Sequence, residues 1–171
     1  MITGQHIAET AINSGLIGTP YSKMDCQAFV EEILKRAGLH IINYRGSNHM
    51  WRDLVYNRES TKGGKTIPAG ALAFIVRFDG GEKRRGYHDD MGNASHVAIA
   101  LGDGTVMEST SGGVQISSIS RFTDYGLIHD VDYDHEDPQQ PVSDDESSTA
   151  ILRGCIASIR EYLNEMEEYL K

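Results

Sequence analysis

The stretch that decides the fold runs from residue 25 to residue 38 and reads Asp-Cys-Gln-Ala-Phe-Val-Glu-Glu-Ile-Leu-Lys-Arg-Ala-Gly. Its apolar residues recur every three or four positions, which is the spacing of an amphipathic helix. Gly38 ends the pattern, as glycine commonly does just beyond a helix. Cys26 therefore falls in the first turn of this helix, where unpaired N–H groups and the helix dipole favour the thiolate, the reactive form of cysteine.

A second informative stretch, residues 95–104, reads Ser-His-Val-Ala-Ile-Ala-Leu-Gly-Asp-Gly. The apolar run predicts a strand that opens with His96, and Gly102-Asp103-Gly104 predicts a hairpin turn after it. A short helix is predicted at residues 3–14. Residues 39–65 are predicted to be irregular except for a short helix at 49–56. Further strands are predicted at 71–78, 105–109, 113–119 and 126–131. Helices that precede an antiparallel sheet indicate an α+β domain.

The C-terminal part of the chain has a different composition. Residues 132–146 are mostly Asp, Glu, Pro and Gln, which cannot build a core. We interpret them as an acidic linker between a domain at residues 1–131 and an amphipathic helix at 147–171. The apolar residues of this helix have heptad spacing: Leu152, Ile156, Ile159, Leu163, Met166 and Leu170. A lone helix of this length is marginal, so we expect a homo-oligomer through residues 147–171, with docking onto the domain as the alternative.

The charge distribution narrows the class of partner. The net charge is −9, but residues 1–123 carry 13 basic and 12 acidic side chains, so the acidity belongs to the remainder. A near-neutral body lacks the concentrated basic face of a nucleic-acid-binding protein. No apolar run approaches the ~20 residues that span a bilayer, and the N-terminus lacks the pattern of a secretory signal. We therefore expect a protein made in the cytoplasm that binds neither nucleic acid nor membrane.

Only two cysteines are present, and we interpret Cys26 as a reactive thiol and Cys155 as a packing thiol. His129, Asp130, Asp132, Asp134 and His135 are close in sequence but lack the spacing of a zinc motif. The sequence thus predicts no metal site.

Taken together, these stretches resemble the NlpC-type cell-wall cysteine peptidases, whose fold is papain-like. The nucleophile motif of that family usually reads Asp-Cys-Ser-Gly-Phe-Val, against Asp-Cys-Gln-Ala-Phe-Val at residues 25–30. Thr19-Pro20-Tyr21 precedes it as in the family, Gly70-Ala71-Leu72-Ala73-Phe74 resembles its first strand, and residues 95–104 resemble its histidine strand. The resemblance covers roughly residues 5–131.

The resemblance implies roles for individual residues. Cys26 would be the nucleophile and His96 its general base. Glu108 stands where the family more commonly has His, Asn or Gln; a carboxylate there can accept the imidazole N–H and stabilise the imidazolium. Tyr21, Asp25 and Gln27 would contact substrate. Tyr21 is alternatively a core residue, and Asp25 alternatively caps the helix.

The implied reaction is hydrolysis of an amide bond in peptidoglycan without a cofactor. The family suggests the bond between D-glutamate and a diamino acid of the stem peptide. The alternative is an N-acetylmuramoyl-L-alanine amidase of the related CHAP type. An alternative of another class is a non-catalytic, oligomeric wall-binding or virion protein that keeps the fold. Delivery as a phage lysin, or export by another route, would bring the chain to the wall.

Overall fold

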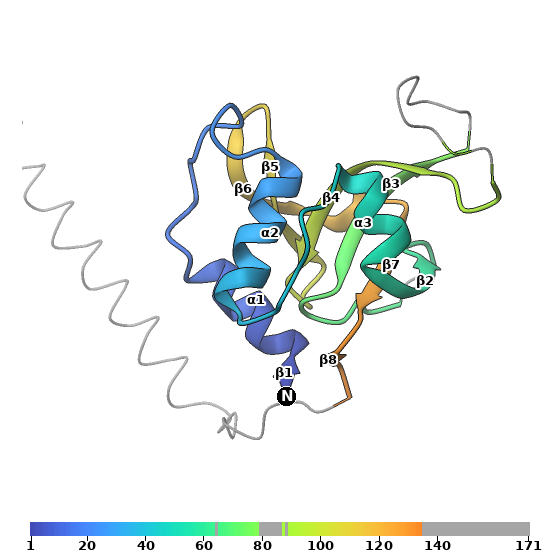
Figure 1. Ribbon diagram of the computed structural model, residues 1–171, viewed down its shortest axis with the longest axis horizontal. Coiled ribbons are helices and arrows are strands. Elements are labelled where there is room, and N and C mark those ends of the chain that lie inside the picture. Colours follow the sequence, from blue (N-terminus) through green and yellow to red (C-terminus); the bar gives the residue numbers. More distant parts are fainter. Residues whose placement is uncertain (64, 79–86, 88, 135–171) are drawn as a thin grey trace, which may run out of the picture. The chain divides into compact units, whose positions relative to one another are not determined.

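The computed structural model (Figure 1) describes residues 1–63, 65–78, 87 and 89–134, and the structural statements below concern these residues. The chain divides into two units, Met1–Asp137 and Pro138–Lys171, and all described residues belong to the first. The predicted helix at 147–171, Cys155 and most of the predicted linker lie outside the described residues and stay predictions.

The first unit is built on a six-stranded antiparallel sheet with strand order β2-β7-β3-β4-β5-β6. The strands are β2 (Val55–Ser60), β3 (Leu72–Arg77), β4 (Asn93–Ala100), β5 (Thr105–Thr110), β6 (Gly113–Ser118) and β7 (Asp124–Ile128). A 3-10 turn, η1 (Ile119–Arg121), joins β6 to β7. A separate parallel pair joins β1 (Ile2–Thr3) to β8 (Val131–Asp132). It holds the N-terminus beside the segment that follows β7.

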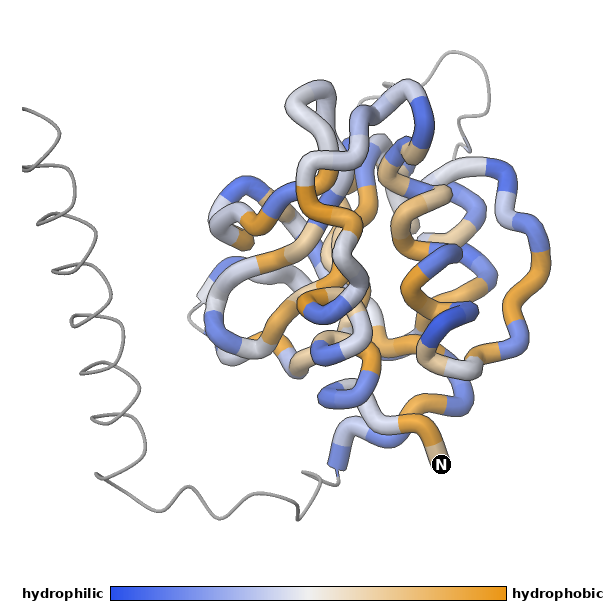
Figure 2. The backbone as a smooth tube through the Cα atoms, turned by 90° about the vertical axis from the view of Figure 1, so that its left-hand side faces the viewer, coloured by the Kyte–Doolittle hydropathy of each residue, from blue (hydrophilic) through white to orange (hydrophobic). Residues whose placement is uncertain are grey.

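Three helices, α1 (Gly4–Ile12), α2 (Cys26–Arg36) and α3 (Ser47–Asp53), pack on the sheet around β4 and β5 (Figure 1). Hydrophobic residues recur along their coils between hydrophilic ones (Figure 2), as an amphipathic helix requires. Phe29, Val30 and Ile33 of α2 are fully buried and belong to one core with Phe74 and Val97 of the sheet. The α+β class, the helix that begins at Cys26 and the β4–β5 hairpin are confirmed.

Two expectations about elements are wrong. Residues 39–65 are not irregular apart from one helix, because β2 lies among them and pairs with β7. As an edge strand of mainly polar residues, with only Val55 buried, β2 lacks the alternation that reveals a strand in sequence. The histidine strand also begins earlier than His96, at Asn93.

No helix in the described part of the chain is long and apolar enough to cross a membrane.

Gly70 is placed where α1 meets the sheet, and we predict that it tolerates no side chain. Its φ is +76°, and a Cβ there would lie 2.2 Å from the carbonyl oxygen of Gly4. Gly70→Ala should therefore lower the free energy of unfolding by about 3 kcal/mol or more. Urea unfolding followed by fluorescence of Trp51, the one tryptophan of the chain, measures this change.

Gly104→Ala is the matched control. Gly104 also has a positive φ, +86°, but a Cβ there would meet nothing within 4 Å. Its cost should be limited to the backbone conformation, about 1 kcal/mol. Equal losses in the two variants would show that the approach of Gly70 to Gly4 is not a constraint.

Candidate active site

Cys26 opens α2 and is a buried residue of the core, with 8% of its surface exposed. Asp25 is the N-cap residue: its Oδ1 accepts a hydrogen bond of 2.8 Å from the backbone N–H of Ala28. This contact fixes the first turn, in which the N–H groups have no helical acceptor of their own. Of the two roles expected for Asp25, helix capping is thus present in the structure, and substrate contact stays a prediction.

His96 lies on β4 next to an irregularity in the strand. The register pairs Ile75 with His96 but Val76 with Ala94, which leaves Ser95 as an extra residue. A bulge of this kind changes the direction of a side chain relative to a regular strand. Asn48 and Ser47 of α3 hold this segment, since Asn48 Oδ1 accepts from the N–H of Ala94 at 3.1 Å and Ser47 Oγ donates to its carbonyl at 2.9 Å.

Glu108, on β5, is the buried end of the constellation. It has no exposed surface, and its Oε2 lies 2.6 Å from Nε2 of His96. Ser117 Oγ donates to Oε1, and Arg121 donates to Oε2. Burial by itself would raise the pKa of Glu108, but the hydrogen bonds from His96 and Ser117 and the charge of Arg121 hold it below the ordinary value. Glu108 is therefore a carboxylate, able to orient and charge-stabilise the imidazole.

Cys26 is the second side chain that acts on His96, because it contributes to the raised pKa of the imidazole. Because Nε2 contacts Glu108, Nδ1 is the ring nitrogen left for the sulfur. Burial alone would lower the pKa of His96, but its interactions with the side chains of Cys26 and Glu108 and their charges raise it to about 9. The imidazole is thus protonated at neutral pH and places a positive charge in the site. The structure brings Cys26, His96 and Glu108 together in this order.

Tyr21 and Gln27 flank the nucleophile in different ways. Tyr21 is 42% exposed, so it is not a core residue. Burial raises the pKa of Tyr21, and so do the charges of Cys26 and Asp25 and its interaction with the Cys26 side chain.

Gln27 instead turns to the segment before α3. Its amide nitrogen donates to Glu31 Oε1 at 2.8 Å and to the carbonyl of Tyr44 at 2.5 Å, and its oxygen accepts from the N–H of Gly46. Both amide hydrogens are thereby used within the protein, which leaves only an acceptor lone pair for a ligand. The role of Gln27 in substrate binding stays a prediction, and only this lone pair of the amide oxygen is left to contact a substrate.

Sequence reasoning missed several residues that position the site: Ser47, Asn48, Ser109, Ser117 and Arg121. Ser109 is fully buried and donates to the carbonyl of Met24 at 2.5 Å, so the strand that carries Glu108 also fastens the loop before Cys26. Ser117 had a signal in the sequence, because the predicted hairpin places it diagonally across from Glu108 on the same face. The other four residues had no signal in the sequence, because their roles depend on contacts between segments far apart in the chain.

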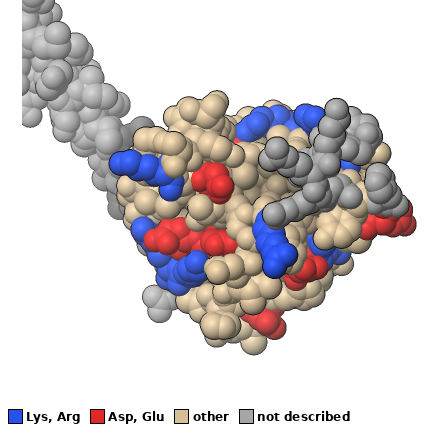
Figure 3. Space-filling model, turned by 45° about the horizontal axis from the view of Figure 1, so that its top comes forward, with Lys and Arg blue, Asp and Glu red and all other residues tan. Residues whose placement is uncertain are grey.

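Trp51 is a core residue: it is 3% exposed and donates its indole N–H to the carbonyl of Met91. Within the described ranges, no group of three or more His, Cys, Asp or Glu side chains is placed to hold a metal ion. Acidic and basic side chains are interspersed on the face drawn in Figure 3, without a continuous field of one sign.

Comparison with known proteins agrees with this arrangement. The chain matches the sequence profile of the NlpC/P60 family over residues 15–126, a span that contains Cys26, His96 and Glu108. The chain belongs to the NlpC/P60 family. No curated protein matches this NlpC/P60 chain.

Solved structures with the NlpC/P60 fold resemble it. The NlpC/p60 domain of the peptidoglycan hydrolase SagA is 24% identical with a TM-score of 0.52, and the match covers 74% of this chain and 100% of that one. An NlpC/P60 family protein from Bacillus cereus ATCC 10987 is 23% identical with a TM-score of 0.50; the match covers 71% of this chain and 40% of that one. Identities this low bear on the fold alone.

The charge state of the NlpC/P60 site can be read from its histidine. We predict that His96 titrates at about 9, because Cys26 and Glu108 both stabilise its protonated form. Cys26→Ala removes one of these partners while burial remains, so the pKa of His96 should fall. Two-dimensional NMR of the imidazole resonances over pH measures this, with the exposed ring of His6 as internal reference. An unchanged titration in Cys26→Ala would show that the thiol does not stabilise the imidazolium.

Proposed function

We propose that this chain is a peptidoglycan hydrolase that cleaves an amide bond of the stem peptide with Cys26 as nucleophile, and that it acts at the cell wall. The observation that carries the proposal is the group formed by three side chains. Cys26 opens α2 and raises the pKa of His96, and Nε2 of His96 lies 2.6 Å from the fully buried carboxylate of Glu108. A wall-binding protein without activity has no need of a thiol paired with a protonated imidazole at a helix N-terminus.

The proposed reaction follows from this geometry. The Cys26 thiolate attacks the amide carbonyl, and the negative charge on the resulting oxyanion is stabilised by the unpaired backbone N–H of Cys26 at the start of α2. Protonated His96 then gives its proton to the leaving amine as the carbon–nitrogen bond breaks. The acyl group stays on the sulfur as a thioester.

Hydrolysis completes the cycle. Neutral His96 takes a proton from water, whose oxygen attacks the thioester carbonyl; the carboxylic acid leaves, and thiolate and imidazolium are restored. Glu108 holds the imidazole in orientation through both steps and stabilises it when it is charged.

Membership in the family, together with the name of the similar SagA hydrolase, supports peptidoglycan as the substrate. Within it, we propose the bond between D-glutamate and the diamino acid. Gln27 and Ala28 replace the Ser-Gly of the usual family motif beside the nucleophile. The bond is therefore the part of the proposal that the experiment must decide.

Mutation of the three residues tests the mechanism. Cys26→Ala and His96→Ala should each abolish release of fragments from purified peptidoglycan without unfolding the protein, because the pair acts as one unit. Glu108→Gln should keep partial activity, since an amide can accept from the imidazole but does not stabilise its charge. Mass spectrometry of the released fragments should find new amino termini on the diamino acid.

Three outcomes of this digestion would change the proposal. Full activity of Cys26→Ala or Cys26→Ser would remove Cys26 as the nucleophile. Stem peptides that begin with L-alanine would assign the amidase reaction instead. Absence of any release by the wild-type protein, with binding to walls retained, would favour the non-catalytic alternative.

We also propose that the chain assembles into a homo-oligomer through residues 147–171. Support comes from the heptad pattern of its apolar residues and from the seven acidic residues at 132–146, which should extend the linker by mutual repulsion. An oligomeric hydrolase, such as a phage lysin, would present several active sites to one wall.

Light scattering should give a multiple of the chain mass for the full-length protein and a monomer for a chain that ends at Tyr133. Ile159→Asp together with Leu163→Asp should also give a monomer, because both substitutions place a charge in the apolar stripe. Glu161→Gln, outside the stripe, is the control and should leave the mass unchanged. A monomeric full-length protein at micromolar concentration would exclude self-association and leave docking onto the domain.

A further inference from the structure

Arg121 shares a carboxylate oxygen with the proposed catalytic histidine. Its guanidinium donates to Oε2 of Glu108, the same atom that lies 2.6 Å from Nε2 of His96. The carboxylate has no exposed surface, whereas the Arg121 side chain is 47% exposed. The cation thus reaches from the solvent side to a buried acceptor.

A carboxylate without solvent stays ionised only while donors or cations surround it. Glu108 has three donors: the imidazole of His96, the hydroxyl of Ser117 and the guanidinium of Arg121. During the proposed reaction His96 loses its positive charge when it protonates the leaving amine, and regains it when it takes a proton from water. Arg121 keeps its charge throughout, because a guanidinium does not deprotonate in this range.

We propose that Arg121 is a positioning residue of this site: its guanidinium keeps Glu108 ionised and aimed at His96 while the histidine is neutral, and so sets the pH range in which Cys26 can react. The inference rests on the proposed function, since it concerns the same cysteine chemistry.

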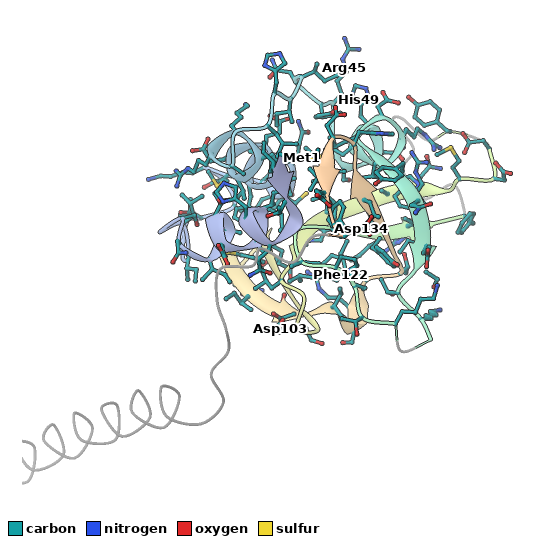
Figure 4. All side chains as sticks on the ribbon, turned by 90° about the horizontal axis from the view of Figure 1, so that it is seen from below. Met1, Arg45, His49, Asp103, Phe122 and Asp134 are labelled. Atoms are coloured by element: carbon teal, nitrogen blue, oxygen red, sulfur yellow. The ribbon has the colours of Figure 1, made fainter. Side chains whose placement is uncertain are left out.

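Local structure holds Arg121 in place for this role. It ends η1, whose first turn is capped by Ser118, and the N–H of Ile119 bonds the carbonyl of Gly104 at 3.1 Å. Phe122 follows it, is 2% exposed, and lies with its ring centroid 5.8 Å from that of His96 (Phe122 is labelled in Figure 4). The Arg121 guanidinium carbon lies 5.1 Å from the Phe122 centroid. One buried ring therefore anchors the turn and borders the histidine.

The charged and titratable groups around Glu108 and His96 come from several parts of the fold. His96 lies on β4, Arg121 on η1 and Cys26 on α2. Tyr21 and Asp25 lie in the loop before α2. Removal of a positive charge makes proton loss harder for every group nearby. In a variant with a neutral residue at 121, Glu108 takes up a proton at higher pH, and His96 keeps its proton to higher pH. The whole pH profile of reactivity should therefore move upward.

The test is the rate of Cys26 alkylation by iodoacetamide as a function of pH, in the full-length chain with Cys155→Ser so that one thiol is read. Arg121→Gln and Arg121→Met, which keeps an aliphatic stem over Phe122, should shift the profile upward by roughly half a pH unit, the effect of a partly exposed charge. Arg121→Lys keeps the charge and should restore the wild-type position. Arg36→Gln is the matched control, because Arg36 is 40% exposed and pairs with Glu32 at 2.8 Å on the far end of α2.

The inference would be overturned if the pH profile of Cys26 alkylation kept its position in both Arg121→Gln and Arg121→Met and only the alkylation rate fell. Arg121 would then be a structural support alone. A shift in Arg36→Gln as large as in Arg121→Gln would overturn it as well. Alkylation needs no peptidoglycan, so the result is separate from the proposed hydrolysis. Wild-type protein that fails to digest peptidoglycan, yet shows the charge-dependent shift, would refute the hydrolase and retain the role of Arg121.

Discussion

A carboxylate that is fully withdrawn from water can remain charged only among donors, and Glu108 meets this requirement with side chains from three different elements. The strand β4 supplies the imidazole, β6 the hydroxyl and η1 the guanidinium. All three elements must be in place before the carboxylate of Glu108 has its hydrogen-bond donors. The ionisation of the site therefore depends on the folded arrangement of the sheet. The orientation and the protonation of His96 follow from this buried charge.

The nucleophile is tied to the histidine by a second route that passes through α3. Gln27 holds the backbone at Tyr44 and Gly46, directly before α3, and the first residues of α3 hold β4 at Ala94, two residues from His96. Ser109 secures the loop before Cys26 from the other side. Movement of the α2 N-terminus relative to β4 would break several of these bonds at once. The helix that carries the thiol and the strand that carries the imidazole are thereby fastened to each other without substrate.

The parts of the site that the sequence predicts are those governed by local pattern. The helix at Cys26 follows from a three-and-four spacing and a capping aspartate, and the hairpin at 102–104 follows from its glycines. Ser117 also falls within reach of such reasoning, through the register of the β5–β6 hairpin. Arg121 does not, because its contact depends on where η1 turns after β6. β2 was missed because a polar edge strand is stabilised by its neighbour β7 and not by its own pattern.

The departure at position 108 and the presence of Arg121 explain each other. A neutral amide or imidazole as the third residue, as the family more commonly has, can be buried against the catalytic histidine with no countercharge. A carboxylate gives stronger stabilisation of the imidazolium, but it leaves an uncompensated buried charge whenever the histidine is neutral. A permanent cation on the solvent side removes that difficulty, and its partial exposure keeps its own desolvation small. Replacement of Glu108 by glutamine would therefore leave Arg121 facing an amide without a charge to balance. Arginine and glutamate are best understood as one unit, in which each charge is needed because the other is present.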